Sequence, residues 1–186
     1  MITREQALEF LNKQIENKNI IKHMLATEAI MQVLAKKLGG DEEKWGMVGL
    51  LHDGDYTSNV PPERQGLEVT EILRKRGFEI PEDVAQAMAA HNHMTGCNPV
   101  TAMDWAIFCG DSLTGLIVAA TLVLPSRKLA DLTVENVLNR FKEKSFAKGT
   151  RREDIALCEE KLGIPLPEFT EICLKAMQNI SNELGL

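Results

Sequence analysis

Apolar positions along this chain recur mainly at the three- and four-residue spacing of amphipathic helices. No segment shows the strict two-residue alternation of a half-buried strand. The spacing predicts helices at residues 4–17, 18–38, 42–52, 62–76, 81–91, 102–124, 133–144, 151–162 and 167–184. We therefore expect an all-α fold, a single-domain helical bundle in which residues 1–125 form the core and residues 126–186 add C-terminal helices to the same domain.

Capping residues mark several of these helix ends. Thr3 and Asp41 precede the first and third helices as N-caps. Gly39 follows the second helix, where a left-handed residue ends a helix at little cost. Pro62 is expected to open the helix that runs to Arg76.

The segment 102–124 is long and apolar enough to raise the question of a membrane span. Asp111 lies in its middle and Asp104 near its start, and a carboxylate in the middle of a bilayer costs a few kcal/mol or more. The central helix of a soluble bundle is the better interpretation.

Composition limits the classes of partner. The 186 residues are 44% hydrophobic and 26% charged, with a net charge of −6 and no apparent signal peptide. An acidic chain is a poor general ligand for nucleic acid polymers or anionic membranes. Cysteines without C-x-x-C spacing are expected to be reduced packing residues of a cytoplasmic protein; they are Cys97, Cys109, Cys158 and Cys173.

The segment that ends in His52 and Asp53 is the first candidate for chemistry. Trp45, Val48 and His52 share one helix face, so the imidazole is expected to point inward. Gly54 follows, and near a frayed helix end both polar side chains can reach one centre. Imidazole and carboxylate are ligands for divalent metals; the alternative is a helix that ends in a His-Asp capping pair.

Asp111 is the second candidate, because it shares an apolar stripe with Ile107 and Thr114. A buried carboxylate needs a partner. A metal ion or a basic side chain would serve, and bonding to neighbouring hydroxyl groups is the alternative. The four histidines all lie in the first half of the chain, and three are on different predicted helices; they are His23, His52, His91 and His93. This distribution favours a polar centre assembled by the fold.

These residues resemble the HD-domain superfamily of metal-dependent phosphohydrolases. His23, the motif LLHDGDY at residues 50–56, and Asp111 in GDSLTG follow the H…HD…D order of that family. The resemblance covers most of the chain and implies a helical bundle with one divalent metal. The ligands it implies are His23, His52, Asp53 and Asp111. Ligand type leaves iron, manganese, cobalt, nickel, zinc and magnesium open.

The resemblance further implies hydrolysis of a small phosphate ester, with nucleotides among the substrates of the family. A bound metal would lower the pKa of a water molecule and withdraw charge from phosphorus. Asp53 is expected to orient the water, with Asp55 as a second candidate base. His91 matches a later family histidine and is expected to bind phosphate or protonate the leaving oxygen. His93 has the weaker case.

One position departs from the family pattern. Gln65 precedes Gly66 where related sequences often carry a further histidine. The departure favours one metal over two, and motivates a second hypothesis, a nucleotide-binding or regulatory module on a catalytically weak scaffold. A helical interaction protein without a metal is the third hypothesis.

A phosphate substrate also requires positive charge. Basic residues gather after the long apolar helix, and for most of them a solvated surface is the better interpretation. The candidates for phosphate contact are Lys128, Arg140 and Lys144. The oligomeric state stays open, because no heptad pattern or apolar stripe specifies a partner surface.

Overall fold

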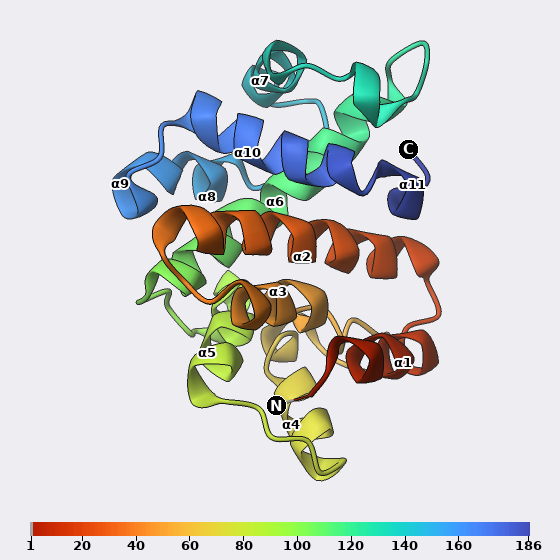
Figure 1. The fold of residues 1–186 in the computed structure, drawn as a ribbon, viewed down its shortest axis with the longest axis vertical. Helices are drawn as coiled ribbons and strands as arrows, with labels where there is room; N and C mark the ends of the chain where they lie inside the picture. Colours follow the sequence, from red (N-terminus) through yellow and green to blue (C-terminus); the bar gives the residue numbers. More distant parts are fainter. Residues whose placement is uncertain (1) are drawn as a thin grey trace.

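The computed structural model describes residues 2–186, which form helices and connecting segments without a β-strand (Figure 1). The all-α prediction is confirmed. The α-helices are α1 (Arg4–Gln14), α2 (Lys18–Leu38), α3 (Glu42–Leu51), α4 (Glu68–Lys75), α5 (Glu82–Ala90), α6 (Ala102–Leu122), α7 (Val134–Lys142), α8 (Arg152–Ala156), α9 (Cys158–Leu162), α10 (Leu166–Asn179) and α11 (Ser181–Leu184). Three 3₁₀ turns are η1 (Pro62–Arg64), η2 (His93–Thr95) and η3 (Leu129–Asp131).

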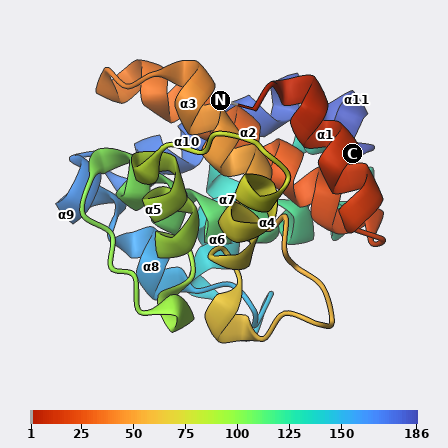
Figure 2. The same ribbon diagram turned by 90° about the horizontal axis from the view of Figure 1, so that it is seen from below.

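Helix α2 crosses the middle of the molecule, with α1, α3, α4 and α5 on one side and α7 to α10 on the other (Figure 1). It packs against α3, α6 and α10. Figure 2 views the molecule from the side of α4 and α5, with α2 and α6 behind them. One hydrophobic cluster runs through both halves of the chain, so the C-terminal helices share the core of the N-terminal ones.

The predicted caps are present. Thr3 accepts a hydrogen bond from the backbone N–H of Gln6 and completes a capping box. Asp41 accepts from the N–H of Lys44 at 3.0 Å, and Gly39 ends α2 with φ of 75°. Helix α1 ends at Gln14, three residues earlier than predicted, and Asn17 caps the start of α2 instead.

A close approach between α2 and α3 sets the position of the HD segment. A Cβ atom at Gly49 would lie 2.7 Å from backbone atoms of Thr27 and Glu28. Only glycine fits at that contact, so α3 lies directly on the backbone of α2. The end of α3 therefore delivers His52 into the interior, where its side chain is fully buried beside Val48.

The continuous helix predicted over residues 62–76 is wrong. Turn η1 ends at Arg64, Gly66 adopts a left-handed φ of +92°, and α4 starts at Glu68. The interruption has a tertiary cause, because Asp55 accepts hydrogen bonds from the backbone N–H groups of Gly66 and Val69.

Two other predicted helices are divided. Residues 151–162 form α8 and α9 with a break at Leu157, and residues 167–184 form α10 and α11 with a break at Ile180. Leu157 has φ −72° and ψ −9°, and Ile180 has φ −115° and ψ 20°, so the chain leaves the α-helical hydrogen-bond pattern at both places.

Helix α6 is the central helix that the sequence predicts. It is long and apolar enough to cross a membrane by length and composition, and 56% of its most apolar window is buried within the structure. It packs against α2, α5, α7, α8 and α9. Asp104 is fully buried, and its carboxylate accepts hydrogen bonds from Thr101 and from the N–H of Val100.

Candidate metal centre

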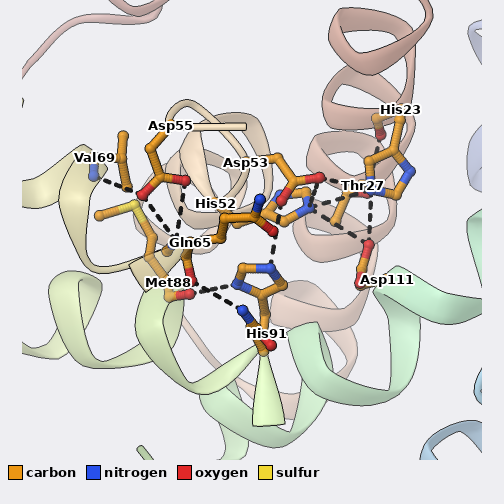
Figure 3. Close-up of polar contacts among 12 residues, drawn as sticks. His23, Thr27, His52, Asp53, Asp55, Gln65, Val69, Met88, His91 and Asp111 are labelled. Atoms are coloured by element: carbon orange, nitrogen blue, oxygen red, sulfur yellow. Dashed lines mark hydrogen bonds and ion pairs between the residues drawn. The ribbon is translucent and has the colours of Figure 1, made fainter. Parts of the chain in front are cut away.

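Five side chains from separate parts of the chain meet between α2, α3, α5 and α6 (Figure 3). His23 lies on α2 and Asp111 on α6, while His52, Asp53 and His91 lie just beyond the ends of α3 and α5. The fold therefore brings together, in one polar centre, residues that lie up to 88 positions apart in the sequence, from His23 to Asp111.

The distances describe a tight cluster. His23 Nε2 lies 2.8 Å from Asp111 Oδ1 and 3.2 Å from His52 Nε2. His52 Nε2 lies 3.4 Å from the same Asp111 oxygen and 3.6 Å from Asp53 Oδ2. The other oxygen of Asp53, Oδ1, lies 3.4 Å from His91 Nε2. Within the described chain, two sets of three residues place their donor atoms within 4.8 Å of one another, one of them His23, His52 and Asp53, the other His52, His91 and Asp111.

Hydrogen bonds outside the cluster orient two of its imidazoles. His52 Nδ1 lies 2.8 Å from the carbonyl oxygen of Gly49, and His91 Nδ1 lies 2.5 Å from the carbonyl oxygen of Met88. A carbonyl oxygen only accepts, so each Nδ1 carries the proton. Both rings therefore turn Nε2 toward the centre, as metal-binding histidines do when their other nitrogen is held by a backbone carbonyl.

The third imidazole is oriented by a hydroxyl group. Thr114 Oγ1 donates to the carbonyl oxygen of Asp111 at 2.7 Å and lies 2.8 Å from His23 Nδ1. Because its single proton is used in the first bond, Thr114 accepts from His23 Nδ1. His23 thus also directs Nε2 inward.

These contacts test whether the residues fit a cation. In the neutral form with the proton on Nδ1, the Nε2 atoms of His23 and His52 face each other with their lone pairs, next to carboxylate oxygens. Asp111 Oδ1 is buried beside these two imidazole nitrogens, at 2.8 Å from His23 Nε2 and 3.4 Å from His52 Nε2. A divalent ion would satisfy these atoms together, and two imidazoles with two carboxylates form a suitable donor set for one.

The pKa shifts of the clustered side chains also indicate that positive charge is favoured beside the two carboxylates. Burial lowers the pKa of His52, but Asp53 and Asp111 outweigh it and raise that pKa to about 9. Burial opposes ionisation of Asp111, yet His23 and His52 hold its pKa well below the usual value. Asp53 follows the same pattern beside His52 and His91, and its pKa is lowered.

Asp55 has a different role from the second base that the sequence suggests. Its side chain is fully buried, and its oxygens accept from the N–H of Gly66 at 2.8 Å and the N–H of Val69 at 2.8 Å. Figure 3 shows Asp55 turned toward Val69 and away from Asp111. Burial raises its pKa despite these bonds. Asp55 fixes the start of α4 and positions the loop behind His91.

Gln65 lies beside His91, as its backbone contacts show. Its carbonyl oxygen accepts from the side chain of Asn92 at 3.2 Å, and a Cβ atom on Gly66 would lie 2.9 Å from the His91 ring. The site where a further imidazole was expected from the family pattern thus adjoins the cluster. His93 is exposed, with Nε2 3.4 Å from Arg151.

A cleft of about 420 Å³ opens beside His23 and Asp111. Its opposite wall is residues 147–151, which include Lys148 and Arg151. Sequence reasoning selected other cations, and none of them lines this cleft; these are Lys128, Arg140 and Lys144.

Arg140 belongs to a neighbouring surface. It donates to Glu143 at 2.8 Å, and its guanidinium lies 4.8 Å from the centre of the Phe146 ring. Lys148 and Arg151 lie in the same basic stretch of sequence, which is the signal that points to them. The basic stretch does not show which of its cations faces the cleft, because that depends on the path of the loop.

One side chain determines that path. Arg152 donates to six backbone carbonyl oxygens around residues 140–150, at distances between 2.6 and 3.5 Å; these are the carbonyl oxygens of Arg140, Phe141, Glu143, Phe146, Ala147 and Thr150. Ala147 takes a left-handed φ of 44° in the segment so held. The guanidinium therefore acts as the internal support of the cleft's basic wall.

Comparisons with known proteins match part of the chain to one family. Residues 20–107 match the family model described as HD domain. This range includes His23, His52, Asp53 and His91 and ends four residues before Asp111.

The curated relatives include Ribonuclease Y of Lawsonia intracellularis (strain PHE/MN1-00), 27% identical over 139 residues, which is 73% of this chain and 26% of the relative. Ribonuclease Y of Nitratidesulfovibrio vulgaris (strain DP4) is 30% identical over 129 residues, 67% of this chain and 24% of that protein. The chain thus matches about a quarter of the length of these relatives. No solved structure matches the chain significantly.

Proposed function

We propose that this protein hydrolyses a phosphate ester of a small organic molecule. The premise is that residues 20–107 belong to the HD-domain family of metal-dependent phosphohydrolases. The proposed metal ligands are His23, His52, Asp53 and Asp111. The observation that carries the proposal is the cluster in which Asp111 Oδ1 lies 2.8 Å from His23 Nε2 and 3.4 Å from His52 Nε2, with Asp53 on its other side.

A divalent ion bound there would polarise a phosphoryl oxygen and lower the pKa of a water molecule. Asp53 is placed to orient that water and accept its proton, because its two oxygens face opposite sides of the cluster. In its imidazolium form, with a proton on Nε2 as well as on Nδ1, His91 would donate a hydrogen bond to the phosphate or a proton to the leaving oxygen. Its Nε2 lies next to Asp53 Oδ1. The same nitrogen is also available as a further ligand.

Lys148 is the proposed cation for the substrate phosphate. It is exposed on the cleft wall, and no ion pair involves it among the described residues. Arg151, in contrast, is paired with Asp154 through two hydrogen bonds. Lys148 is therefore free to act as a point charge toward phosphate, and Arg151 shapes the wall.

A second candidate function follows from Gln65. Its amide replaces an expected imidazole next to His91, so a nucleotide-binding or regulatory module with weak catalysis is the alternative. The names of the curated relatives also make a phosphodiester in RNA a substrate to test, although the net charge of −6 disfavours long polyanions.

Elemental analysis of the purified protein tests the metal centre. Wild type is compared with Asp111→Asn, and Asp104→Asn is the matched control on the same helix, since Asp104 caps α6 without touching the cluster. We expect about one equivalent of metal in wild type and control, and loss of metal from Asp111→Asn. Equal metal in all three, or none after reconstitution, would remove the basis of the proposal.

A substrate screen separates the two functions. Metal-replete protein is incubated with p-nitrophenyl phosphate, bis-p-nitrophenyl phosphate, nucleotides and a single-stranded RNA. Turnover that disappears in His52→Ala supports the hydrolase. Saturable nucleotide binding without turnover in any assay supports the module instead.

A further inference from the structure

A second hollow begins where the cleft ends. It has a volume of about 430 Å³ and shares His23 and Gly115 with the cleft beside the metal centre. From there it runs between α2 and α6, away from Asp111, toward Asn19 at the start of α2 and Leu122 at the end of α6. Helix α11 lies next to the start of α2 (Figure 1), and the hollow is lined there by Leu184 and the two residues that follow it.

Small residues on two helices keep this hollow open. Asp111, Gly115 and Ala119 are spaced four residues apart and so share one face of α6. A Cβ atom at Gly115 would meet nothing within 4 Å, so the space above it is empty of protein. Ala26 lies on the facing side of α2, one turn after His23.

The chemistry of the hollow changes along its length. The end at the metal centre is polar, with His23 and Thr114, whereas the middle is lined by apolar side chains such as Val118 and Leu122. Lys22 adds a positively charged side chain to the lining of the hollow. A molecule that fits along this path has a phosphate at one end and an apolar body.

We propose that this groove binds the organic part of the substrate, an apolar group of aromatic or aliphatic character, and that Gly115 and Ala119 are specificity-determining residues. The inference rests on the proposed function, because it takes the phosphate to lie at the metal centre. A volume near 430 Å³ falls within the range of about 300–1,000 Å³ that small-molecule sites occupy.

The apolar lining also argues against one class of substrate. A phosphorylated polyol would lose hydrogen bonds to water in the middle of this groove without gaining partners from Ala26, Val118 or Ala119. An apolar group is instead stabilised by transfer from water to these walls.

Calorimetric titration with two non-hydrolysable phosphonates tests the inference without any need for turnover. Metal-loaded wild type is titrated with methylphosphonate and with naphthylmethylphosphonate. We expect the naphthyl compound to bind at least about tenfold more tightly, since its ring is buried in the groove. Gly115→Leu should abolish this advantage while metal content stays at the wild-type value.

Ala119→Leu repeats the test one helical turn farther from the metal ligands, in case leucine at Gly115 disturbs folding. A naphthyl advantage that survives in both variants overturns the inference and leaves the proposed function intact. If wild type binds neither phosphonate, the phosphate site itself is refuted and the inference falls with it. These two results are distinguished by methylphosphonate alone.

Discussion

Thr114 connects two proposed metal ligands through one hydroxyl group, since it accepts from His23 Nδ1 and donates to the carbonyl oxygen of Asp111. Thr114→Val keeps the shape of the side chain and removes the acceptor. We expect metal affinity to fall by about 10- to 100-fold, as is typical when a hydrogen bond that orients a ligand is lost. Competition with a chelator of known affinity measures the change.

Thr121→Val is the control for this substitution. Thr121 is also a buried threonine of α6, and its hydroxyl donates to the carbonyl oxygen of Ile117, away from the cluster. Metal affinity should be unchanged in this variant. Equal losses in both variants would show that the effect of Thr114→Val comes from the helix and not from His23.

The site residues differ in how far local sequence predicts them. His52 could be assigned to the interior because Trp45 and Val48 share its helix face, and the structure buries it completely. The role of Asp55 could not be predicted, because its partners Gly66 and Val69 lie 11 and 14 residues away and are brought to it by a loop. The sequence alone does not show whether a carboxylate next to an HD pair contacts a ligand or accepts hydrogen bonds from backbone N–H groups.

The contact between α2 and α3 depends on the absence of a side chain at Gly49. In Gly49→Ala the new methyl group meets backbone atoms of Thr27 and Glu28 at 2.7 Å, and backbone cannot move aside as a flexible side chain can. We expect the free energy of unfolding to fall by about 1–3 kcal/mol or more. Chemical denaturation of the metal-free protein measures it.

Gly115→Ala is the matched substitution on α6, where the added methyl group meets nothing within 4 Å. Alanine is the better helix former by up to about 1 kcal/mol, so this variant should be as stable as wild type or more stable. If Gly49→Ala were equally harmless, α3 would have room to move on α2 and the placement of His52 would need another explanation.

The segment between α7 and α8 depends on Arg152. Arg152→Lys keeps the charge but replaces a planar fork of five donors with a single ammonium group, so most bonds to the six carbonyl oxygens are lost. We expect faster amide hydrogen exchange over residues 143–150 and a loss of about 2 kcal/mol in stability.

Arg64→Lys is the control for that variant. Arg64 forms ion pairs with Glu68 and Glu71 on an exposed surface, and such pairs contribute only about 0–1 kcal/mol. Exchange over residues 143–150 should be unaffected in this control. Unchanged exchange in Arg152→Lys as well would contradict the supporting role of the guanidinium.

Helix starts were predicted well because their signals are local. Thr3 and Asp41 cap the helices that follow them, and Lys18–Leu38 has the predicted bounds. The break at Gly66 was missed because apolar spacing continues through it. Its cause is that the backbone N–H groups of Gly66 and Val69 donate to the carboxylate of Asp55, a contact that no local pattern contains.

Three cysteines lie in the shared core of the molecule, and burial raises the pKa of each thiol. For Cys158 the pKa rises to about 11, and for Cys109 and Cys173 it is also raised. The thiolate is the reactive form of cysteine, so a raised pKa leaves a smaller fraction of thiolate at pH 8. The reaction rate increases only as the pH approaches the raised pKa. We expect iodoacetamide to label the partly exposed Cys97 first in the folded protein at pH 8.

Mass spectrometry of tryptic peptides identifies the labelled positions. The unfolded protein is the control, and there all four cysteines should react at similar rates. Labelling of Cys158 in the folded state as fast as Cys97 would mean that α9 does not stay packed on α6.

The bundle as a whole was predictable because its helices bury continuous apolar faces. The basic residues that line the cleft were not predictable. Lys128, Arg140 and Lys144 were selected from composition, yet Lys148 and Arg151 face the candidate metal centre. The difference arises from tertiary contacts of Arg152, which decide where the chain between α7 and α8 runs.

Arg152 has a consequence for how this protein can change. It holds the cleft wall by carbonyl oxygens, which every amino acid possesses, and not by the side chains of the wall itself. A residue of the wall such as Lys148 can therefore be exchanged while the backbone keeps its course. We therefore expect substitutions in this wall to change which molecules fit the cleft while the side chains of the candidate metal centre keep their positions.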